Sequence, residues 1–192
     1  MANIASGTSG TCNWVIDENG ILTISPSSGS SGTLGNWGLE PPWTNYVTNI
    51  TSCIVSGTIT ALTMRGFLKG CANITSVNIS GLDTSQCTEV LFAFFGCSKL
   101  ANLDLTNLNT TNATDFNMMF SNTDILTQII LGSNFDMSKY NAADPYFPEP
   151  DFCLSGALSP LRCENSANGI VISDDKAFIA LTTTQRAGTW TR

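Results

Sequence analysis

Residues 71–96 read CANITSVNISGLDTSQCTEVLFAFFG, and residues 97–122, CSKLANLDLTNLNTTNATDFNMMFSN, repeat their pattern without a gap. A third copy begins at Thr123 and contains one additional residue before Phe135. A fixed period of this length is typical of a solenoid, in which one unit buries too little surface alone and stacks on its neighbours. The recurring apolar residues are Cys71, Ile74, Val77, Ile79 and Leu82, then Cys97, Leu100, Leu103, Leu105 and Leu108, then Leu126, Ile129, Leu131 and Phe135.

Within each unit, alternating apolar and polar residues predict a short strand with one buried face, as in Val77-Asn78-Ile79 and Leu103-Asp104-Leu105. A turn is expected next, at Asp83-Thr84-Ser85 and its counterparts Asn109-Thr110-Thr111 and Asp136-Met137-Ser138. Side chains of these types hydrogen-bond their own backbone. The interchange of Asp with Asn at this position indicates a turn former rather than a titrating acid.

A short helix is expected to follow the turn. Thr88-Glu89 and Thr114-Asp115 place a hydroxyl cap and an acid at its start. Apolar residues then recur four positions apart, which places them on one helical face. These residues are Val90 and Phe94 in one unit, and Phe116 and Phe120 in the next. The sequence therefore predicts an α/β solenoid of about three 26-residue strand–turn–helix units.

The open ends of such a stack need caps. We expect a β-rich N-terminal cap at residues 1–47, repeats at 48–140 and a mixed C-terminal cap at 141–192. The C-terminal cap is expected to contain an irregular Pro-rich segment, a strand at 170–172 and a short helix capped by Ser173.

The N-terminal cap has its own signals. Residues 12–16 and 21–24 predict a hairpin whose turn, at 17–20, ends in glycine. Pro41-Pro42-Trp43 suits a rigid aromatic plug. Residues 50–66 resemble a degenerate first repeat, whose apolar positions are Cys53, Val55, Ile59 and Leu62.

The composition excludes several classes of function. Of the 192 residues only 12% are charged, the net charge is −7 and histidine is absent. Too few basic residues are present for nucleic-acid binding, and histidine-based triads and most catalytic zinc sites are excluded. No apolar run is long enough for membrane insertion. The N-terminus lacks a secretion signal, so either a leader was removed or the protein leaves its cell by another route.

The seven cysteines include no C-x-x-C pair, which argues against a metal site, and we expect neither a metal nor a cofactor. Cys71 and Cys97 occupy equivalent repeat positions and are expected to be buried. Cys153 and Cys163 flank a loop-like stretch and could close a disulfide. Asp174-Asp175 suit a helix start, so no pair of catalytic carboxylates is expected and the protein is predicted not to be an enzyme.

The repeats resemble the BspA-type leucine-rich repeats, whose units run as MF-x-GC, then L-x-x-L-x-L, then a D-T-S-like step. The segment SGTCNWVIDENGILTISP with PPWTNY also resembles the N-terminal cap of that family, and the resemblance covers residues 6–140. In the third unit, Asn122-Thr123 replaces Gly-Cys and Ile130 replaces the polar mid-strand residue. The resemblance implies a short right-handed leucine-rich-repeat coil on a surface-exposed protein, often of gut or mucosal microbes, with adhesion and partner binding as its role.

Solenoids commonly bind through the strand-bearing face, where side chains between the buried ones point outward. Here that face is expected to carry amides and hydroxyls suited to a glycan or a peptide, although an ordinary solvated surface is the alternative. A partner could also bind the caps, which hold the four tryptophans at 14, 37, 43 and 190. The candidate ligand-binding residues of the strand face are Ser76, Asn78, Ser80, Asn102, Asp104, Thr106, Gln128 and Ile130.

The leading hypothesis is a non-enzymatic recognition or adhesion module, displayed outside a cell and bound to a protein or glycan of a host or neighbouring cell. The alternative is a structural or receptor-binding tail, fibre or decoration protein of a phage virion, because lysis releases such a protein without a leader. Self-association is left open.

Overall fold

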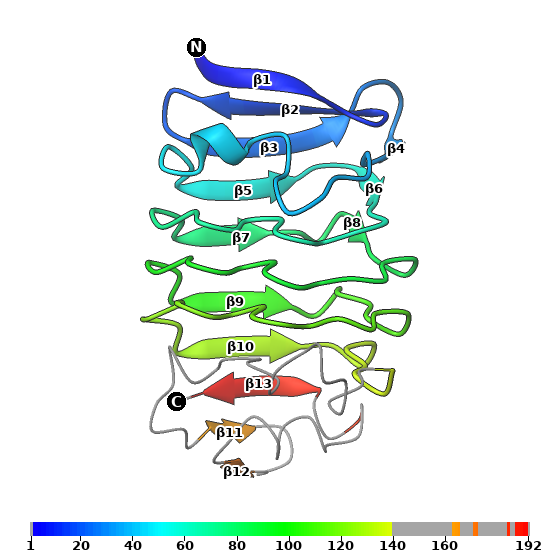
Figure 1. Ribbon diagram of the computed structural model, residues 1–192, viewed down its shortest axis with the longest axis vertical. Helices are drawn as coiled ribbons and strands as arrows, with labels where there is room; N and C mark the ends of the chain where they lie inside the picture. The colour runs from blue at the N-terminus through cyan, green and yellow to red at the C-terminus, as the bar shows by residue number, and fades with distance from the viewer. Residues whose placement is uncertain (1, 140–162, 166–170, 173–183, 185–186, 192) are drawn as a thin grey trace.

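The computed structural model describes residues 2–139, 163–165, 171–172, 184 and 187–191, and its chain coils as a β-solenoid of about four turns (Figure 1). The coils stack along the long axis, with β1 at one end and β12 at the other. No helix in this described part of the chain is long and apolar enough to cross a membrane. The repeats therefore stack as the sequence predicts, with more turns than the three units expected.

The strands form three sheets. The N-terminal sheet has the order β1-β2-β3-β5-β7, with β1 at Asn3–Ser9, β2 at Cys12–Asp17, β3 at Ile21–Pro26, β5 at Ser52–Val55 and β7 at Ser76–Asn78. The second has the order β12-β11-β13-β10-β9, with β9 at Asn102–Leu105, β10 at Gln128–Leu131, β11 at Cys163–Asn165, β12 at Val171–Ile172 and β13 at Gly188–Thr191. The third has the order β4-β6-β8, with β4 at Ser31–Thr33, β6 at Thr58–Thr60 and β8 at Leu82–Asp83.

The predicted N-terminal hairpin is confirmed, since β2 and β3 pair antiparallel. Asp17 fixes the turn, because its Oδ1 accepts hydrogen bonds from the backbone N–H groups of Asn19 and Ile21, both at 2.9 Å. The sequence reading missed β1, which adds a further antiparallel strand at the end of the sheet. β3 then pairs parallel with β5, so the cap continues directly into the coils.

The interior of the solenoid is a column of stacked apolar side chains. Cys53, Leu103 and Ile129 occupy equivalent positions on β5, β9 and β10 and are all buried. Cys71 and Cys97 are also fully buried, as their repeat positions predict, and both are free thiols. The predicted turn is confirmed too, because Asp83 and its counterparts accept a backbone hydrogen bond from the residue two positions later.

The predicted helices are wrong. Where Thr88-Glu89 and Thr114-Asp115 were expected to start helices, the chain forms successive tight turns. We call residues 64–70, 90–96 and 116–122, stacked on consecutive coils, the turn ribbon. In it, backbone N–H groups alternate between two acceptors: Leu68 N–H donates to Ala93 O of the next coil at 2.7 Å, and Lys69 N–H donates to Gly66 O at 3.0 Å.

In this bonding pattern, two residues of each coil adopt the left-handed backbone conformation. An α-helix contains no residue in that conformation. The first position is Gly66 (φ +61°) and then Phe92 (φ +56°) and Met118 (φ +52°) in the following coils. The second is Gly70 (φ +78°), then Gly96 (φ +73°), then Asn122 (φ +59°). Asparagine tolerates this region best after glycine, which explains why Asn122 replaces the glycine of the Gly-Cys step. The four-residue apolar spacing therefore reflects paired turns, not a helical face.

The degenerate first repeat is present as a coil that contains β5, β6 and the first segment of the turn ribbon. Cys53, Val55 and Ile59 are buried as expected, but Leu62 is 40% exposed and Ala61 takes the interior place. At the other end, β12 confirms most of the strand predicted at 170–172. The Pro-rich segment and the helix expected from Ser173 lie outside the described residues, so the composition of the C-terminal cap stays a prediction.

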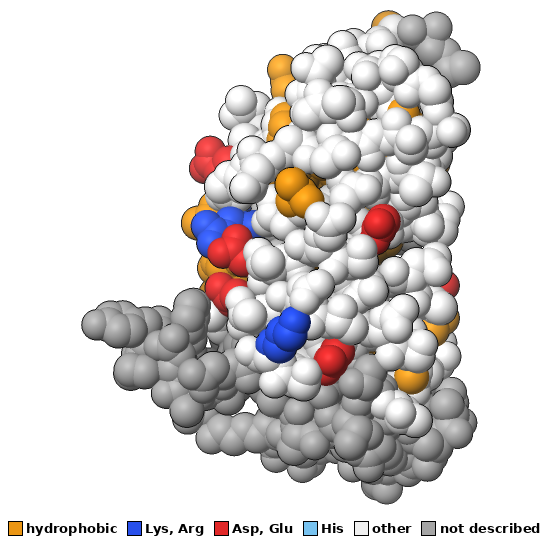
Figure 2. Space-filling view, turned by 90° about the vertical axis from the view of Figure 1, so that its right-hand side faces the viewer, with side chains coloured by type: hydrophobic (Ala, Val, Ile, Leu, Met, Phe, Trp, Pro, Cys, Tyr) orange, Lys and Arg blue, Asp and Glu red, His pale blue; other side chains and the backbone are white. Residues whose placement is uncertain are grey.

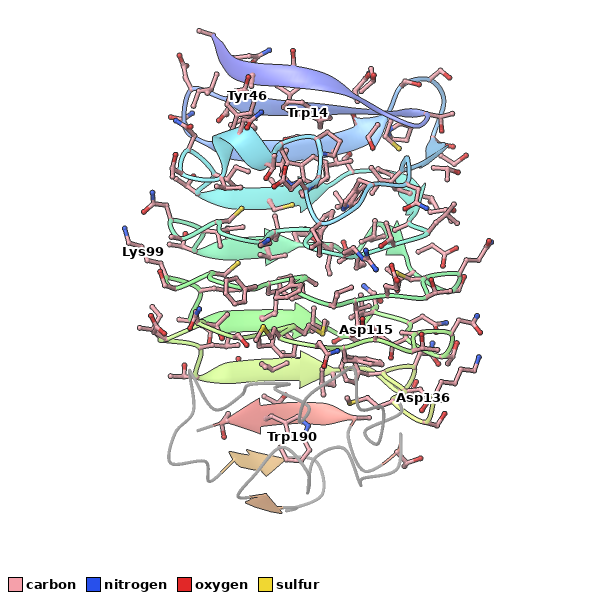
Figure 3. The ribbon with its side chains drawn as sticks, in the orientation of Figure 1. Trp14, Tyr46, Lys99, Asp115, Asp136 and Trp190 are labelled. Carbon is pink, nitrogen blue, oxygen red and sulfur yellow. The ribbon has the colours of Figure 1, made fainter. Side chains whose placement is uncertain are left out.

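An aromatic cluster fills the N-terminal end of the interior, where Figure 3 places Trp14 and Tyr46 side by side. Trp43, which precedes the 3-10 turn η1 at Thr44–Tyr46, is fully buried and packs edge-on against Phe67 at 5.5 Å between ring centroids. Its Nε1–H donates to Phe67 O at 2.8 Å. The aromatic plug predicted at Pro41-Pro42-Trp43 is therefore confirmed.

Candidate ligand site on the strand face

The strand face is the outer surface of β7, β9 and β10 together with Ser80 and Thr106, which follow β7 and β9. The eight candidate residues all point outward from it, as the alternation of the strands requires. Six are exposed, and Gln128 and Ile130 on β10 are half-buried. The sequence therefore predicted which side chains share this surface.

Two side chains of this face are held in place by their own turns. Asn78 Oδ1 accepts hydrogen bonds from Ser80 N–H at 3.1 Å and Ser80 Oγ–H at 2.8 Å. Asp104 Oδ1 makes the same pair of bonds with Thr106, at 2.9 and 2.5 Å. One oxygen of each side chain therefore orients it, and because both side chains are exposed, Asn78 Nδ2 and Asp104 Oδ2 remain for a ligand.

The backbone ladder of the strand face is interrupted between β7 and β9. β7 pairs with β5, and β9 pairs with β10, but within the described residues no pairing joins β7 to β9. At the entrance to the strands, Thr75 N–H donates to Thr51 O and Thr127 N–H donates to Ala101 O. Among the described residues no equivalent bond connects Ala101 to Thr75, although β7 and β9 lie on successive rungs (Figure 1).

A change in coil length coincides with this interruption. Ser52 and Ser76, which face each other across β5 and β7, are 24 residues apart, whereas Ala101 and Thr127 are 26 residues apart. The coil between β7 and β9 is two residues longer than the coil between β5 and β7.

A hollow of about 360 Å³ opens at the interruption, a volume within the range of small-molecule sites. Val77 forms part of its wall and is only half-buried, whereas its counterparts Cys53, Leu103 and Ile129 are buried. Of the four strands β5, β7, β9 and β10, β7 is therefore the one on which this core position is partly exposed. The hollow is lined by Val77, Asn78, Ile79, Ser80, Asp104 and Asn107.

The chemistry of the hollow is that of a hydrogen-bonding site. Its lining offers two amides, a hydroxyl and one carboxylate, that of Asp104, with no basic or aromatic side chain. Such a set can orient a ligand that carries both hydrogen-bond donors and acceptors. It holds no general acid–base pair, because Asp104 is the one titratable residue that lines it.

Two other carboxylates lie close together, on the turn side of the coil. Glu89 and Asp115 occupy equivalent positions on successive coils, and the Glu89 carboxylate pairs with Arg65 at 2.6 Å. Burial raises the pKa of Asp115 above its ordinary value, and the neighbouring Glu89 charge adds to this rise. Neither residue lines the hollow, so this pair belongs to the stacking of the coils and not to the candidate site.

Of the eight candidate residues, Asn78, Ser80 and Asp104 line the hollow. Ser76, Asn102 and Thr106 are not among its lining residues but lie on the same strands or directly after them, and Gln128 and Ile130 lie on β10, one rung farther. Asn107 was missed, because the candidates were the alternate positions along each strand, and Asn107 directly follows Thr106. The available signal was that Asn107 is a polar residue just before the next turn.

The tryptophans of the two caps are largely enclosed. Trp14, Trp43 and Trp190 are buried, and Trp37 is half-buried with its Nε1–H bonded to Arg65 O at 2.8 Å. A partner surface made of exposed tryptophans is therefore wrong. The predicted disulfide cannot be placed, because Cys153 and the side chain of Cys163 lie outside the described residues.

Comparison with known proteins connects the chain to one family. No curated protein and no solved structure matches it. A family model described as a Mycoplasma protein of unknown function, DUF285, matches residues 47–152, which is more than half of the chain and covers the coils from the end of the N-terminal cap onward. By this match, the chain belongs to the DUF285 family, whose function is unknown.

Proposed function

We propose that this protein is a non-enzymatic recognition or adhesion module that works outside a cell and binds its ligand on the strand face. The observation that carries the proposal is the hollow between β7 and β9, because polar side chains and uncovered backbone meet there in a site of small-molecule size. The resemblance of the repeats to BspA-type surface proteins favours the same role.

The surface supports this proposal through its low charge. Figure 2 shows a face on which acidic and basic side chains are few and scattered. Hydroxyl and amide surfaces hydrogen-bond to neutral partners with little charge-dependent steering. Recognition of a glycan or a protein by local hydrogen bonds suits such a surface better than attraction to a highly charged polymer.

A second candidate is a structural or receptor-binding protein of a phage particle. The five described cysteines outside the C-terminal region, Cys12, Cys53, Cys71, Cys87 and Cys97, are all free and buried. Burial raises the pKa of the Cys87 thiol to about 11 and that of Cys71 to about 12, which suppresses thiolate chemistry. A chain that folds with reduced thiols suits assembly inside a cell followed by release through lysis.

Binding to immobilised desialylated mucin, a surface that carries both neutral glycans and polypeptide, tests the recognition role. We expect the wild-type protein to bind, and the double variant Asn78→Ala/Asp104→Ala to lose at least about tenfold in affinity, which corresponds to about 1.4 kcal/mol. Asp124→Ala, which removes an exposed carboxylate outside the strand face, is the control and should bind as the wild type does. Absence of wild-type binding, or equal binding by the double variant, would contradict the proposed site.

A further inference from the structure

We propose that the hollow between β7 and β9 binds the hydroxyl groups of a neutral sugar, which bridge the two unpaired strand edges, and that it does not bind a peptide strand. This inference rests on the proposed function and specifies the ligand class of the same site. It follows from the width of the interruption, from the groups that line it and from their charge.

The width excludes an inserted strand. Adjacent strands lie about 4.8 Å apart, so a peptide that paired with both edges would hold β7 and β9 roughly 9.6 Å apart. Residues of β7 and β9 have Cα atoms within 8 Å of each other, which is too close for a third strand to lie between them, although no ladder joins the two strands. The gap therefore admits single polar groups that hydrogen-bond to both edges, as a bridging water molecule does.

The groups around the gap match hydroxyls. The facing strand edges carry backbone N–H donors and C=O acceptors, because β7 and β9 do not pair with each other. A hydroxyl donates one hydrogen bond and accepts others, so one group can serve both edges. The Nδ2 of Asn78 and Oδ2 of Asp104, with the amide of Asn107, supply further donors and acceptors for neighbouring hydroxyls.

The charge of the site selects a neutral sugar. Asp104 is the one charged residue of the lining, and the whole chain carries a net charge of −7. A phosphate, a sulfate or a sialic acid would meet a carboxylate without a compensating cation in the lining, which is unfavourable. A neutral hydroxyl that donates to Asp104 forms a charge-assisted hydrogen bond instead.

The test uses neutral O-glycans released from desialylated mucin and, separately, the deglycosylated mucin polypeptide, each titrated against the full-length protein by calorimetry. We expect the glycans to bind, and Asp104→Asn to weaken their binding at least about tenfold. This variant keeps the Oδ1 acceptor for Thr106 and therefore the local fold, which unchanged thermal melting would verify. Asp124→Asn, which makes the same substitution at an exposed carboxylate outside the strand face, is the control and should leave glycan binding unchanged.

The outcomes separate this inference from the proposed function. Binding of the polypeptide but not of the glycans, with loss in Asn78→Ala/Asp104→Ala, overturns the sugar and leaves recognition by the strand face intact. Glycan binding that is equal in wild type and Asp104→Asn overturns the assignment of the sugar to this hollow. If neither probe binds, the inference and the proposed function both fail.

Discussion

The two sides of the coil, the strand face and the turn ribbon, hold the same repeats together in different ways. On the turn ribbon, bonds between coils are continuous: residues 90–96 bond both to 64–70 before them and to 116–122 after them. On the strand face, the ladder stops between β7 and β9. The coils therefore stay together at the interruption because the opposite side holds them, and the hollow opens without loss of the stack.

This difference explains where strain and function are placed. The turn ribbon places Phe92 and Met118 in left-handed conformations, each at a cost of about 1–2 kcal/mol, so that its N–H groups can reach the next coil. The strand face uses ordinary extended backbone and leaves some of its edges unpaired. The hydrogen bonds of the turn ribbon therefore hold together the coils around the hollow, where the strands themselves are not paired.

The largest expected effect comes from removing the interior that both sides share. Leu105→Asp places a charge where the side chain is fully buried and has no partner, which costs several kcal/mol. We expect the variant to be unfolded at room temperature by circular dichroism. Asp104→Asn, one residue earlier but exposed on the strand face and still able to accept from Thr106, is the control and should melt as the wild type does. A folded Leu105→Asp protein would show that the strand rungs do not form the common core.

A second, smaller effect should distinguish the turn ribbon from the strand face. Gly96→Ala adds a Cβ that meets nothing closer than Gly70 Cα at 3.5 Å, so steric contact is ordinary and the remaining cost is that of φ +73°. We expect a loss of about 1–2 kcal/mol in denaturant unfolding. Gly38→Ala, whose Cβ points into open space without a positive φ, should be close to neutral. Equal stability of the two variants would contradict a backbone constraint at the ribbon.

The smallest effect concerns the carboxylates stacked beside the turn ribbon. Because the folded pKa of Asp115 lies above its unfolded value, the folded state binds its proton more tightly, and stability falls as the pH rises through the folded pKa. Asp115→Asn keeps an acceptor for the Asn117 backbone N–H and removes the charge beside Glu89. We expect its melting temperature to exceed that of the wild type by roughly 1–3 °C at pH 7, a shift that corresponds to about 1 kcal/mol or less.

The pH dependence sharpens this prediction. Towards about pH 4, near the ordinary pKa of an aspartate, the wild-type carboxyl gains its proton and the difference in melting temperature should shrink. Asp124→Asn, which removes an exposed carboxylate, is the control and should show no such convergence. A melting-temperature difference that grows on acidification would mean that Asp115 is stabilised in its charged form.

Much of the fold could be predicted because the repeat fixes which residues face inward. The 26-residue period and the strand alternation placed Leu103 and Leu105 inside and Asn78 and Asp104 outside, as observed. The helices could not be excluded by apolar spacing, since Val90 and Phe94 point inward either from one helical face or from two successive tight turns. Gly66, Gly70 and Gly96 were the available signal, because glycines at these recurring positions break a helix and permit left-handed turns.

The sequence by itself determined the stacking of the coils, the interior column and the membership of the strand face, because each follows from a local period of apolar and polar residues. The hollow and the missing pairing between β7 and β9 were decided by the tertiary structure, since they depend on how two neighbouring coils lie against each other. Strand pairing is set by the relative displacement of two rungs, and that displacement is a property of neighbouring coils and not of either one alone.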